Sequence, residues 1–394
     1  MSVLRLAIPS PLRRHFDYLA PIGVSNAELV GLQPGIRLRV PFGRREVTGY
    51  LLAVVEDSDI PLSSLKHAVE ILDEAPLIDP QLLHLCRWAA DYYHHPHGEV
   101  FGTLFPKRLR EGKPQQPHGI LVWQLTTLGK GLPEAALPRS PRQAHAISLL
   151  MQKPVIENTE FRDNSISATV LRSLQDKKLV ESHIVSERLQ PIRVNEGLTL
   201  NSEQYAALNA VTGTKQGFSC HLLEGVTGSG KTEIYLRLIE NCLQQGRQAL
   251  ILVPEIGLTP QTLARFQQRF EANIAVLHSG LSDANRYQAW EAARTGNAHI
   301  IVGTRSAVFT PLASPGLIIV DEEHDGSYKQ QDGFRYSARD VAVKRAQIHS
   351  VPILLGSATP SLESIQNVVA GRYQHQQLTQ RASSGGMPDI KVLD

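Results

Sequence analysis

The sequence has few cysteines and no long hydrophobic segment. Its 394 residues include 3 cysteines, which lie far apart at Cys86, Cys220 and Cys242. Without a C-x-x-C spacing, they indicate neither a disulfide framework nor a zinc site. No apolar run approaches the ~18 residues of a membrane-spanning helix, and the N-terminus has no apolar signal segment. These absences favour a cytoplasmic protein that does not contact a membrane.

A large excess of charge of either sign is also missing. The 40 Lys and Arg residues nearly balance the 38 Asp and Glu residues. The charges are nevertheless segregated, because arginines crowd the segment from Arg13 to Arg45 and acids follow from Glu56 to Glu74. A segregated basic face can bind a phosphate backbone, and a solvated face with local ion pairs is the alternative.

The length and the ordinary hydrophobic share of 42% predict two or three globular domains. Residues 1–105 contain short strand-like runs separated by the turns Pro34-Gly35 and Phe42-Gly43, followed by a helix that Asp79-Pro80 would open. They predict a small β-barrel-like domain. Residues 106–117, rich in Pro, Lys, Arg, Gly and Gln, predict a linker.

Residues 118–195 have the pattern of a winged-helix domain. Ser140-Pro141 and Ser167 would start two helices, and short strands follow at Leu179-Val180 and Ile184-Val185. The second helix of such a domain often enters a DNA groove. A structural spacer and a protein-docking module remain open alternatives.

Residues 196–394 alternate strand and helix patterns, which predicts an α/β lobe with a parallel sheet. One loop there satisfies G-x-x-x-x-G-K-[ST], between an apolar run and a helical pattern. Such a loop wraps a triphosphate with backbone N–H groups, and a plain Gly-rich turn is the alternative. Lys231 would contact the β and γ phosphates of ATP, and Thr232 would bind Mg²⁺. The predicted nucleotide-binding residues are Gly225, Val226, Thr227, Gly228, Ser229, Gly230, Lys231 and Thr232.

A second motif makes this lobe an ATPase candidate. Asp321 ends the apolar run Leu317 to Val320, which predicts a buried parallel strand. A carboxylate at the carboxyl end of such a strand can hold the metal ion, and Glu322 beside it can orient the attacking water. We therefore expect Lys231, Asp321 and Glu322 to be the catalytic residues.

Three further motifs follow strands of the same lobe, at residues 253–259, 302–307 and 356–360. Taken singly, each could be an ordinary turn. Their order resembles that of superfamily 2 helicases. The resemblance implies that Thr259, Thr304 and Arg305 contact the single-strand backbone, which fits their capacity to bind phosphates. It also implies that the Ser-Ala-Thr element couples the ATP site to DNA through Ser357, Ala358 and Thr359.

A polar loop at residues 325–336 carries Tyr328, Phe334 and Tyr336. It could stack unpaired bases and report DNA occupancy to Glu322, or its aromatics could anchor a surface loop to the core. Together with the segments 16–18, 40–43 and 200–204, this loop resembles the PriA family of replication-restart helicases (primosomal protein N′). The resemblance covers essentially the whole chain.

The resemblance implies a role for each of these segments. The first domain would bind the 3′ end of a nascent DNA strand, with Phe16, Asp17 and Tyr18 at its pocket, and Gln204 would contact the adenine of ATP. Alternatively, Phe16 and Tyr18 point inward from a strand and Asp17 points outward. The partners implied by the family are forked and single-stranded DNA, primosome proteins and single-strand-binding protein.

One departure from the family pattern affects the expected activity. The family continues into a second helicase lobe, with an arginine finger and a zinc-binding insertion, and neither occurs before Asp394. We therefore expect zinc only in that missing half. Two hypotheses remain: the parent protein is an ATP-driven 3′-to-5′ DNA helicase of replication restart, and this chain alone is a fork-binding module that hydrolyses ATP slowly.

Overall fold

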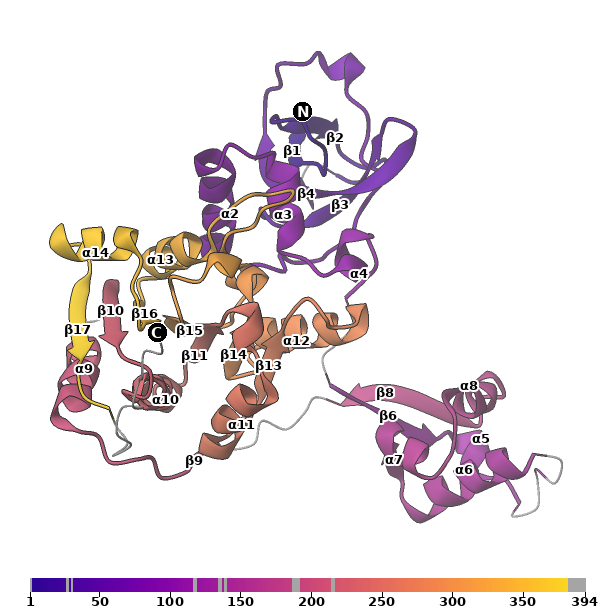
Figure 1. The fold of residues 1–394 in the computed structure, drawn as a ribbon. Coiled ribbons are helices and arrows are strands. Elements are labelled where there is room, and N and C mark those ends of the chain that lie inside the picture. Colours follow the sequence, from indigo (N-terminus) through magenta and orange to yellow (C-terminus); the bar gives the residue numbers. More distant parts are fainter. Residues whose placement is uncertain are drawn as a thin grey trace, which may run out of the picture. The chain divides into compact units, whose positions relative to one another are not determined.

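The computed structural model describes residues 2–25, 28–29, 31–115, 119–133, 137, 140–185, 192–213 and 217–381 (Figure 1). The chain forms two compact units. One comprises Met1–Gln115 with Gln190–Asp394, and the other comprises Gln116–Leu189. Among the described residues, no helix is both long and apolar enough to cross a membrane.

The N-terminal part of the first unit is an antiparallel sheet with three helices beside it. The strand order is β2-β1-β4-β3-β5. The helix expected after Asp79 is present, because the Asp79 carboxylate accepts a hydrogen bond from the Leu82 N–H and proline occupies the first turn. The elements are β1 (Val3–Ala7), β2 (Phe16–Leu19), β3 (Arg37–Phe42), β4 (Arg45–Val55), β5 (Glu70–Ile71), α2 (Pro80–Tyr92), α3 (His97–Thr103) and α4 (Lys107–Arg110).

The structure differs from the linker predicted over residues 106–117 in its part up to residue 115, and residues 116 and 117 lie outside the described residues. The segment contains helix α4, and its Leu109 is fully buried. The buried guanidinium of Arg37 pairs with Asp73 at 2.7 Å and also donates to the carbonyls of Leu109 (2.6 Å) and Lys113 (3.2 Å). Because a buried charge needs partners, these carbonyls fix residues 107–113 to the domain.

The second unit is a three-stranded sheet covered by short helices. Its strand order is β7-β6-β8, and its core includes Trp123, Leu150, Phe161 and Leu171. The two expected helices are present as α6 and α8. The two short strands predicted after them are instead one strand, β8. The elements are β6 (Ile120–Leu125), α5 (Thr127–Lys130), α6 (Pro141–Gln152), β7 (Val155–Glu157), α7 (Asn158–Asp163), α8 (Ala168–Asp176) and β8 (Val180–Val185).

The C-terminal part of the first unit is the expected α/β lobe. Seven strands pair in parallel in the order β13-β14-β11-β15-β16-β10-β17. The strands are β10 (Ser219–Gly225), β11 (Gln248–Leu252), β13 (Ile274–Leu277), β14 (Ile300–Gly303), β15 (Pro315–Val320), β16 (Pro352–Ser357) and β17 (Gln374–Leu378). The helices are α9 (Ser202–Thr212), α10 (Lys231–Gln244), α11 (Pro260–Arg269), α12 (Asp283–Thr295), α13 (Ala338–His349) and α14 (Leu362–Val369).

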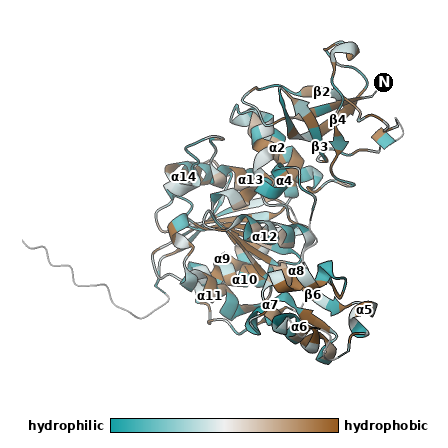
Figure 2. Ribbon diagram, turned by 90° about the vertical axis from the view of Figure 1, so that its right-hand side faces the viewer, coloured by the Kyte–Doolittle hydropathy of each residue, from teal (hydrophilic) through white to brown (hydrophobic). Residues whose placement is uncertain are grey.

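The strands of this sheet are apolar on both faces, as a parallel sheet between helices requires. In Figure 2 they are brown between two layers of helices. Along β11, Leu250 packs toward α12 and α13, whereas Ala249 and Ile251 pack toward α10 and α11. The short strand β9 (Arg193–Val194) pairs with β12 (Phe270–Glu271), so the segment just before α9 belongs to this lobe.

The N-terminal domain and the lobe share one hydrophobic core, which runs from α2 and α3 to α12 and α13. Polar contacts reinforce this junction. The indole N–H of Trp290 donates to the Leu104 carbonyl at 2.7 Å, and Lys107 lies 3.2 Å from Asp283. The two parts therefore form one packed unit around the sites described below.

Candidate functional site

The phosphate loop lies between β10 and α10, at the carboxyl end of the sheet. Gly228 and Gly230 have φ angles of 82° and 86°, which favour glycine strongly over other residues. Gly230 precedes α10 and provides no capping side chain, so the N-terminal N–H groups of the helix can receive an anion. The Lys231 ammonium is buried and donates to the Gly225 carbonyl at 2.6 Å. This arrangement fits the phosphates of a nucleotide.

Asp321 directly follows β15, and its carboxylate contacts the helix that the phosphate loop opens. The Tyr235 hydroxyl on α10 donates to its carboxylate at 2.9 Å. Burial and the Glu322 charge raise the pKa of Asp321, against the opposing effects of Tyr235 and Lys231. A cation would relieve this cost, and Mg²⁺ needs only one or two carboxylates together with phosphate oxygens. Asp321 therefore fits a magnesium ion, and the metal-binding role of Thr232 stays a prediction. The described residues contain no cluster of three or more metal-binding side chains.

The turn after Asp321 connects to the Ser-Ala-Thr element. Glu322 has a φ of 45°, an unusual conformation for a residue with a side chain, and it is partly exposed. His324 Nδ1 is hydrogen-bonded to Ser357 Oγ at 2.7 Å, and Ser357 Oγ also accepts from the Thr359 N–H at 3.0 Å. A shift at this element would therefore reach His324, whose Nδ1 lies 3.6 Å from the Glu322 carboxylate. The coupling role of Ser357, Ala358 and Thr359 stays a prediction.

Glu323 is a site residue that sequence reasoning missed. Its carboxylate is fully buried and accepts from Arg339 (3.0 Å), from the Ser361 N–H (2.7 Å) and hydroxyl (3.0 Å), and from the Ser364 hydroxyl (2.8 Å). The sequence feature that could have pointed to Glu323 is the S-x-x-S pattern from Ser361 to Ser364, which caps α14. Glu323 thus ties the turn after β15 to α13 and to the start of α14.

Gln204, predicted to contact adenine, is buried against the phosphate loop. Its amide accepts from the Asn201 N–H at 2.9 Å and donates to the Ser229 carbonyl at 2.8 Å. The first bond is half of a capping box at the start of α9. Gln204 therefore connects α9 to the phosphate loop, and its contact with adenine stays a prediction.

The aromatic loop does not present its rings to solvent, which favours the anchoring alternative, and base stacking stays a prediction. Tyr328, Phe334 and Tyr336 are only 2%, 6% and 7% exposed. The Tyr328 hydroxyl lies 2.6 Å from the Asp321 carbonyl and 3.0 Å from the Leu252 carbonyl, at the ends of β15 and β11. The rings anchor the loop to the core, as in the alternative interpretation, because their burial and hydroxyl bonds stabilise this position.

The same loop also packs against the N-terminal domain. The Phe334 ring lies 5.1 Å from the His95 ring and 6.0 Å from the Tyr93 ring. The Tyr93 hydroxyl accepts from the Ser337 N–H at 3.3 Å, and burial raises the pKa of Tyr93 to about 12. The loop therefore bridges the segment just after helix α2 and the strand end that precedes Asp321.

Residues 16–18 lie on β2 in the arrangement of the alternative interpretation. Phe16 and Tyr18 pack in the domain core, and the Tyr18 hydroxyl donates to the Pro41 carbonyl at 3.1 Å. Asp17 points the other way and accepts from Arg5 (both bonds 3.0 Å) and from Ser58 (2.7 Å). Burial raises the pKa of Asp17, but these hydrogen bonds outweigh it and hold the pKa below its ordinary value. A DNA end would have to compete with Arg5, so the pocket role stays a prediction.

The predicted backbone-contacting residues lie along the carboxyl ends of β11 and β14. Thr259 caps α11 by accepting from the Thr262 N–H at 3.2 Å, and Thr304 is buried. Arg305 donates to the carbonyls of Ser327 (2.9 Å) and Lys329 (3.2 Å) in the aromatic loop. A hollow of about 450 Å³ beside them is lined by Glu255, Leu258, Pro260, Leu263, Val276, His278, Ser279 and Thr304. Their contact with DNA stays a prediction.

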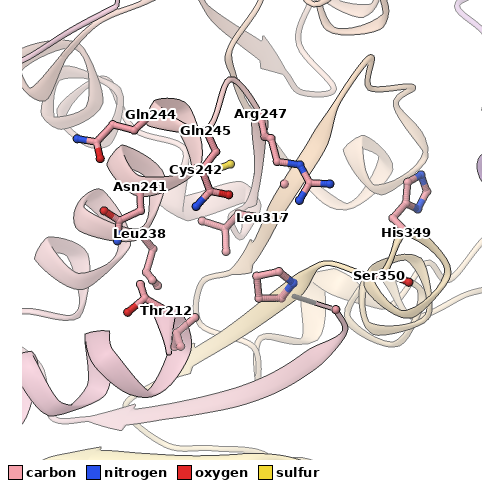
Figure 3. Close-up of a pocket in the computed structure, with 14 residues that line it drawn as sticks. Thr212, Leu238, Asn241, Cys242, Gln244, Gln245, Arg247, Leu317, His349 and Ser350 are labelled. Carbon is pink, nitrogen blue, oxygen red and sulfur yellow. The ribbon is translucent and has the colours of Figure 1, made fainter. Parts of the chain in front are cut away.

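A larger hollow, of about 900 Å³, lies at the opposite end of the sheet (Figure 3). Its lining includes Asn241 and Cys242 near the end of α10, and Arg247 and Ser350 before β11 and β16. Ligands of open α/β sheets bind at the carboxyl ends of the strands. This hollow is therefore not the nucleotide site, despite its size.

Three family profiles match consecutive parts of the chain. Residues 5–106 match the profile described as 3′DNA-binding domain (3′BD), and residues 119–182 match that of the primosomal protein N′-like winged helix. Residues 201–368 match the profile of DEAD/DEAH box helicases. These matches confirm the winged-helix prediction and the helicase class of the nucleotide-binding lobe.

Curated relatives match along almost the whole chain. Replication restart protein PriA of Haemophilus influenzae is 43% identical over 405 residues, which cover 100% of this chain and 54% of that protein. Replication restart protein PriA of Bacillus subtilis is 32% identical, covering 97% of this chain and 56% of that protein. The chain thus spans about half the length of these relatives.

Solved structures give weaker matches. The structure of RecG bound to a three-way DNA junction has a TM-score of 0.38 and 20% identity, and it covers 50% of this chain and 27% of that chain. The UvsW helicase from bacteriophage T4 has a TM-score of 0.34 and 15% identity, covering 66% of this chain and 90% of that chain.

Proposed function

Because this chain belongs to the PriA family of replication restart proteins, we propose that it is part of an ATP-dependent 3′-to-5′ DNA helicase that acts at stalled or abandoned replication forks. The observation that carries this proposal is the meeting of the phosphate loop with Asp321. The Tyr235 bond and the charge of Lys231 both act on this carboxylate. A phosphate-binding loop and a carboxylate that can hold the metal ion are the two parts that phosphoryl transfer requires of this lobe.

The residues of this chain would have the following roles in ATP binding and hydrolysis. Lys231 and the N–H groups at the start of α10 bind the β and γ phosphates of ATP, and Glu322 orients the attacking water. Thr232 and Asp321 hold Mg²⁺, which supplies charge neutralisation at the phosphates. Glu322 directly follows Asp321, and its partly exposed side chain supports its role in orienting water.

We further propose that this chain alone hydrolyses ATP slowly and acts mainly in fork binding. The largest charge effects on the Asp321 pKa come from Glu322 and Lys231, and none of these largest effects comes from an arginine. An arginine finger supplies roughly 10³–10⁵ in rate in related phosphoryl transfers. Binding of a DNA fork does not need an arginine finger, so the chain can bind forks without hydrolysing ATP rapidly.

The proposed DNA contacts come from two regions. The N-terminal domain would receive the free 3′ end near Asp17, and the lobe would follow a single strand with Thr259, Thr304 and Arg305. Hydrogen bonding between His324 and Ser357 supports coupling of that strand to Glu322. Forked DNA is the proposed substrate, with primosome assembly as its consequence.

Fork binding tests this proposal through the 3′ end. The affinities of the wild type and Asp17→Ala are measured by fluorescence anisotropy for forks with a free or a blocked 3′-hydroxyl. We expect Asp17→Ala to weaken binding of the free-ended fork about tenfold and to spare the blocked one, since a lost buried hydrogen bond costs ~1–3 kcal/mol. Equal losses on both forks would instead assign Asp17 to the Arg5 pair alone. A wild type that binds neither fork would contradict the proposed function.

A further inference from the structure

The N-terminal domain contains a cavity of about 510 Å³ that the functions proposed above do not use. It lies between the β3–β4 strands and helices α3 and α4, and Phe334 of the aromatic loop forms part of its wall. Its volume is within the range of small-molecule sites. Its lining residues are Pro9, Arg39, Glu46, Val47, Thr48, Tyr50, Gly98, Glu99, Gly102, Thr103, Arg110, Glu111 and Phe334.

Tyr50 brings an unsatisfied hydroxyl to this cavity. Its side chain is 1% exposed, and its ring stacks on Phe105 with the centroids 5.0 Å apart. The hydroxyl has no hydrogen-bond partner among the described residues. Burial raises the pKa of Tyr50, so the group remains a donor at neutral pH. Because a buried donor without an acceptor is costly, the hydroxyl is available to an acceptor atom of a ligand.

Gly102 leaves the space that such a ligand needs. A Cβ atom at this position would lie 3.9 Å from the Tyr50 hydroxyl and 4.0 Å from Cδ of Arg110. The glycine therefore separates the hydroxyl from the arginine stem without filling the gap. The charge of Arg110 acts on the Tyr50 hydroxyl, which places positive charge at this end of the cavity.

The acidic residues of the wall already have side-chain partners within the domain. Glu99 lies 2.7 Å from His95, Glu111 lies 2.7 Å from Lys113, and Glu46 lies 3.9 Å from Arg39. Arg110, in contrast, has no ion pair or side-chain hydrogen bond within the described part of the chain. The donors left for a ligand are thus one buried hydroxyl and one guanidinium, beside the apolar wall of Pro9, Val47 and Phe334.

We propose that this cavity binds a single phosphorylated nucleotide. Its phosphate is bonded by Arg110 and the Tyr50 hydroxyl, and its base lies against the apolar wall. Guanidinium groups favour phosphate oxygens, and a flat base can cover the edge of an aromatic ring. The inference rests on the proposed function, since the domain matches a DNA-binding profile, and a unit of the bound strand or a free nucleotide has the required chemistry.

The position of the cavity gives its occupant a path to the ATP site. Phe334 forms part of the wall, and it belongs to the loop whose Tyr328 hydroxyl contacts the Asp321 carbonyl. A ligand that prefers one position of Phe334 would change the equilibrium of this loop, and nucleotide binding at Lys231 would change in return. Occupancy is therefore expected to alter ATP affinity.

The test compares Tyr50→Phe and Arg110→Met with the wild type. Arg108→Met is the matched control, because it removes the same charge from the same helix but does not line the cavity. Anisotropy measures binding of a short oligothymidylate, and calorimetry measures binding of thymidine monophosphate. We expect each cavity variant to weaken binding about tenfold, as loss of one phosphate contact implies, and the control to have little effect.

Thermal unfolding separates binding from structure. Tyr50→Phe removes a hydroxyl that has no partner, so its Tm should not fall even though binding weakens. Weaker binding of the oligomer alone assigns the site to the DNA strand, and weaker binding of the monophosphate assigns it to a free nucleotide. If the cavity variants bound both ligands as tightly as a wild type that binds DNA normally, this inference would be overturned and the proposed function would stand. A wild type that binds no DNA would overturn the proposed function together with it.

Discussion

Replacing Tyr328 by phenylalanine removes a single oxygen atom from the most buried ring of the aromatic loop. That oxygen lies 2.6 Å from the Asp321 carbonyl and 3.0 Å from the Leu252 carbonyl, and the side chain is only 2% exposed. Burial also raises the pKa of Tyr328, so the hydroxyl stays a donor. Both strand-end carbonyls would lose this donor, while the ring would keep its packing.

The expected cost of Tyr328→Phe follows from this geometry. A buried group left without its hydrogen-bond partner loses about 1–3 kcal/mol. Because one hydroxyl proton serves both carbonyls, we expect the lower half of this range, about 1–2 kcal/mol. We also expect a lower maximal rate of ATP hydrolysis at saturating DNA, since the turn that carries Asp321 loses its anchor. Nucleotide affinity should change little.

Urea unfolding followed by tryptophan fluorescence measures the stability change, and Tyr205→Phe provides a matched control because Tyr205 is exposed at 59%. The hydrolysis rate is measured at saturating ATP and DNA, in a longer protein that includes the second helicase lobe expected from the family resemblance. If Tyr328→Phe matched the wild type in both stability and maximal rate, the hydroxyl would not hold the strand ends, and the anchoring interpretation of the loop would be refuted.

Three further perturbations test other parts of the site. Glu323→Gln should destabilise the lobe by about 1–3 kcal/mol, because four donors lose a charged acceptor; chemical denaturation checks this, and an unchanged midpoint would contradict the network. Asp321→Asn should abolish hydrolysis yet raise the Tm of the nucleotide-free chain, since its raised pKa makes the ionised form costly above that pKa; a lower Tm would contradict this. Asp17 has a lowered pKa, so its contribution to stability is full above its ordinary value of 3.8 and is lost as the pH falls through the folded-state pKa. Unfolding curves of wild type and Asp17→Asn should therefore converge at acidic pH, and a constant difference would refute the assignment.

Local sequence patterns were sufficient to predict the structure wherever a motif and the residues that it contacts lie close together in the chain. The phosphate loop needs only glycines, a lysine and the adjoining strand and helix, and the structure has all of them in place from Gly225 to Lys231. Asp79 likewise caps α2 with a residue three positions away. Strand–helix alternation predicted the parallel sheet because crossover helices leave few other topologies.

The burial of a side chain could not be predicted from the sequence where the residues that it contacts lie far along the chain. Leu109 looked like part of a linker because its segment is rich in Lys, Arg and Pro, but Arg37, 72 positions away, needs its carbonyl. Tyr328, Phe334 and Tyr336 resembled exposed stacking rings, yet this loop packs against α2, where Tyr93 contacts Ser337 across 244 positions. Composition does not report such pairs, so it could not decide between a stacking platform and an anchored loop.

Steady-state ATP hydrolysis by the wild type and Lys231→Ala, with and without forked DNA, tests the central claim most directly. The claim is that the phosphate loop and Asp321 form a DNA-responsive ATP site. We expect the wild type to hydrolyse ATP slowly and faster with forked DNA, and Lys231→Ala to lose both rates, because the phosphates lose the ammonium that the structure places beside Asp321. Equal hydrolysis by both proteins, or none by the wild type even when the second lobe is included, would contradict the account.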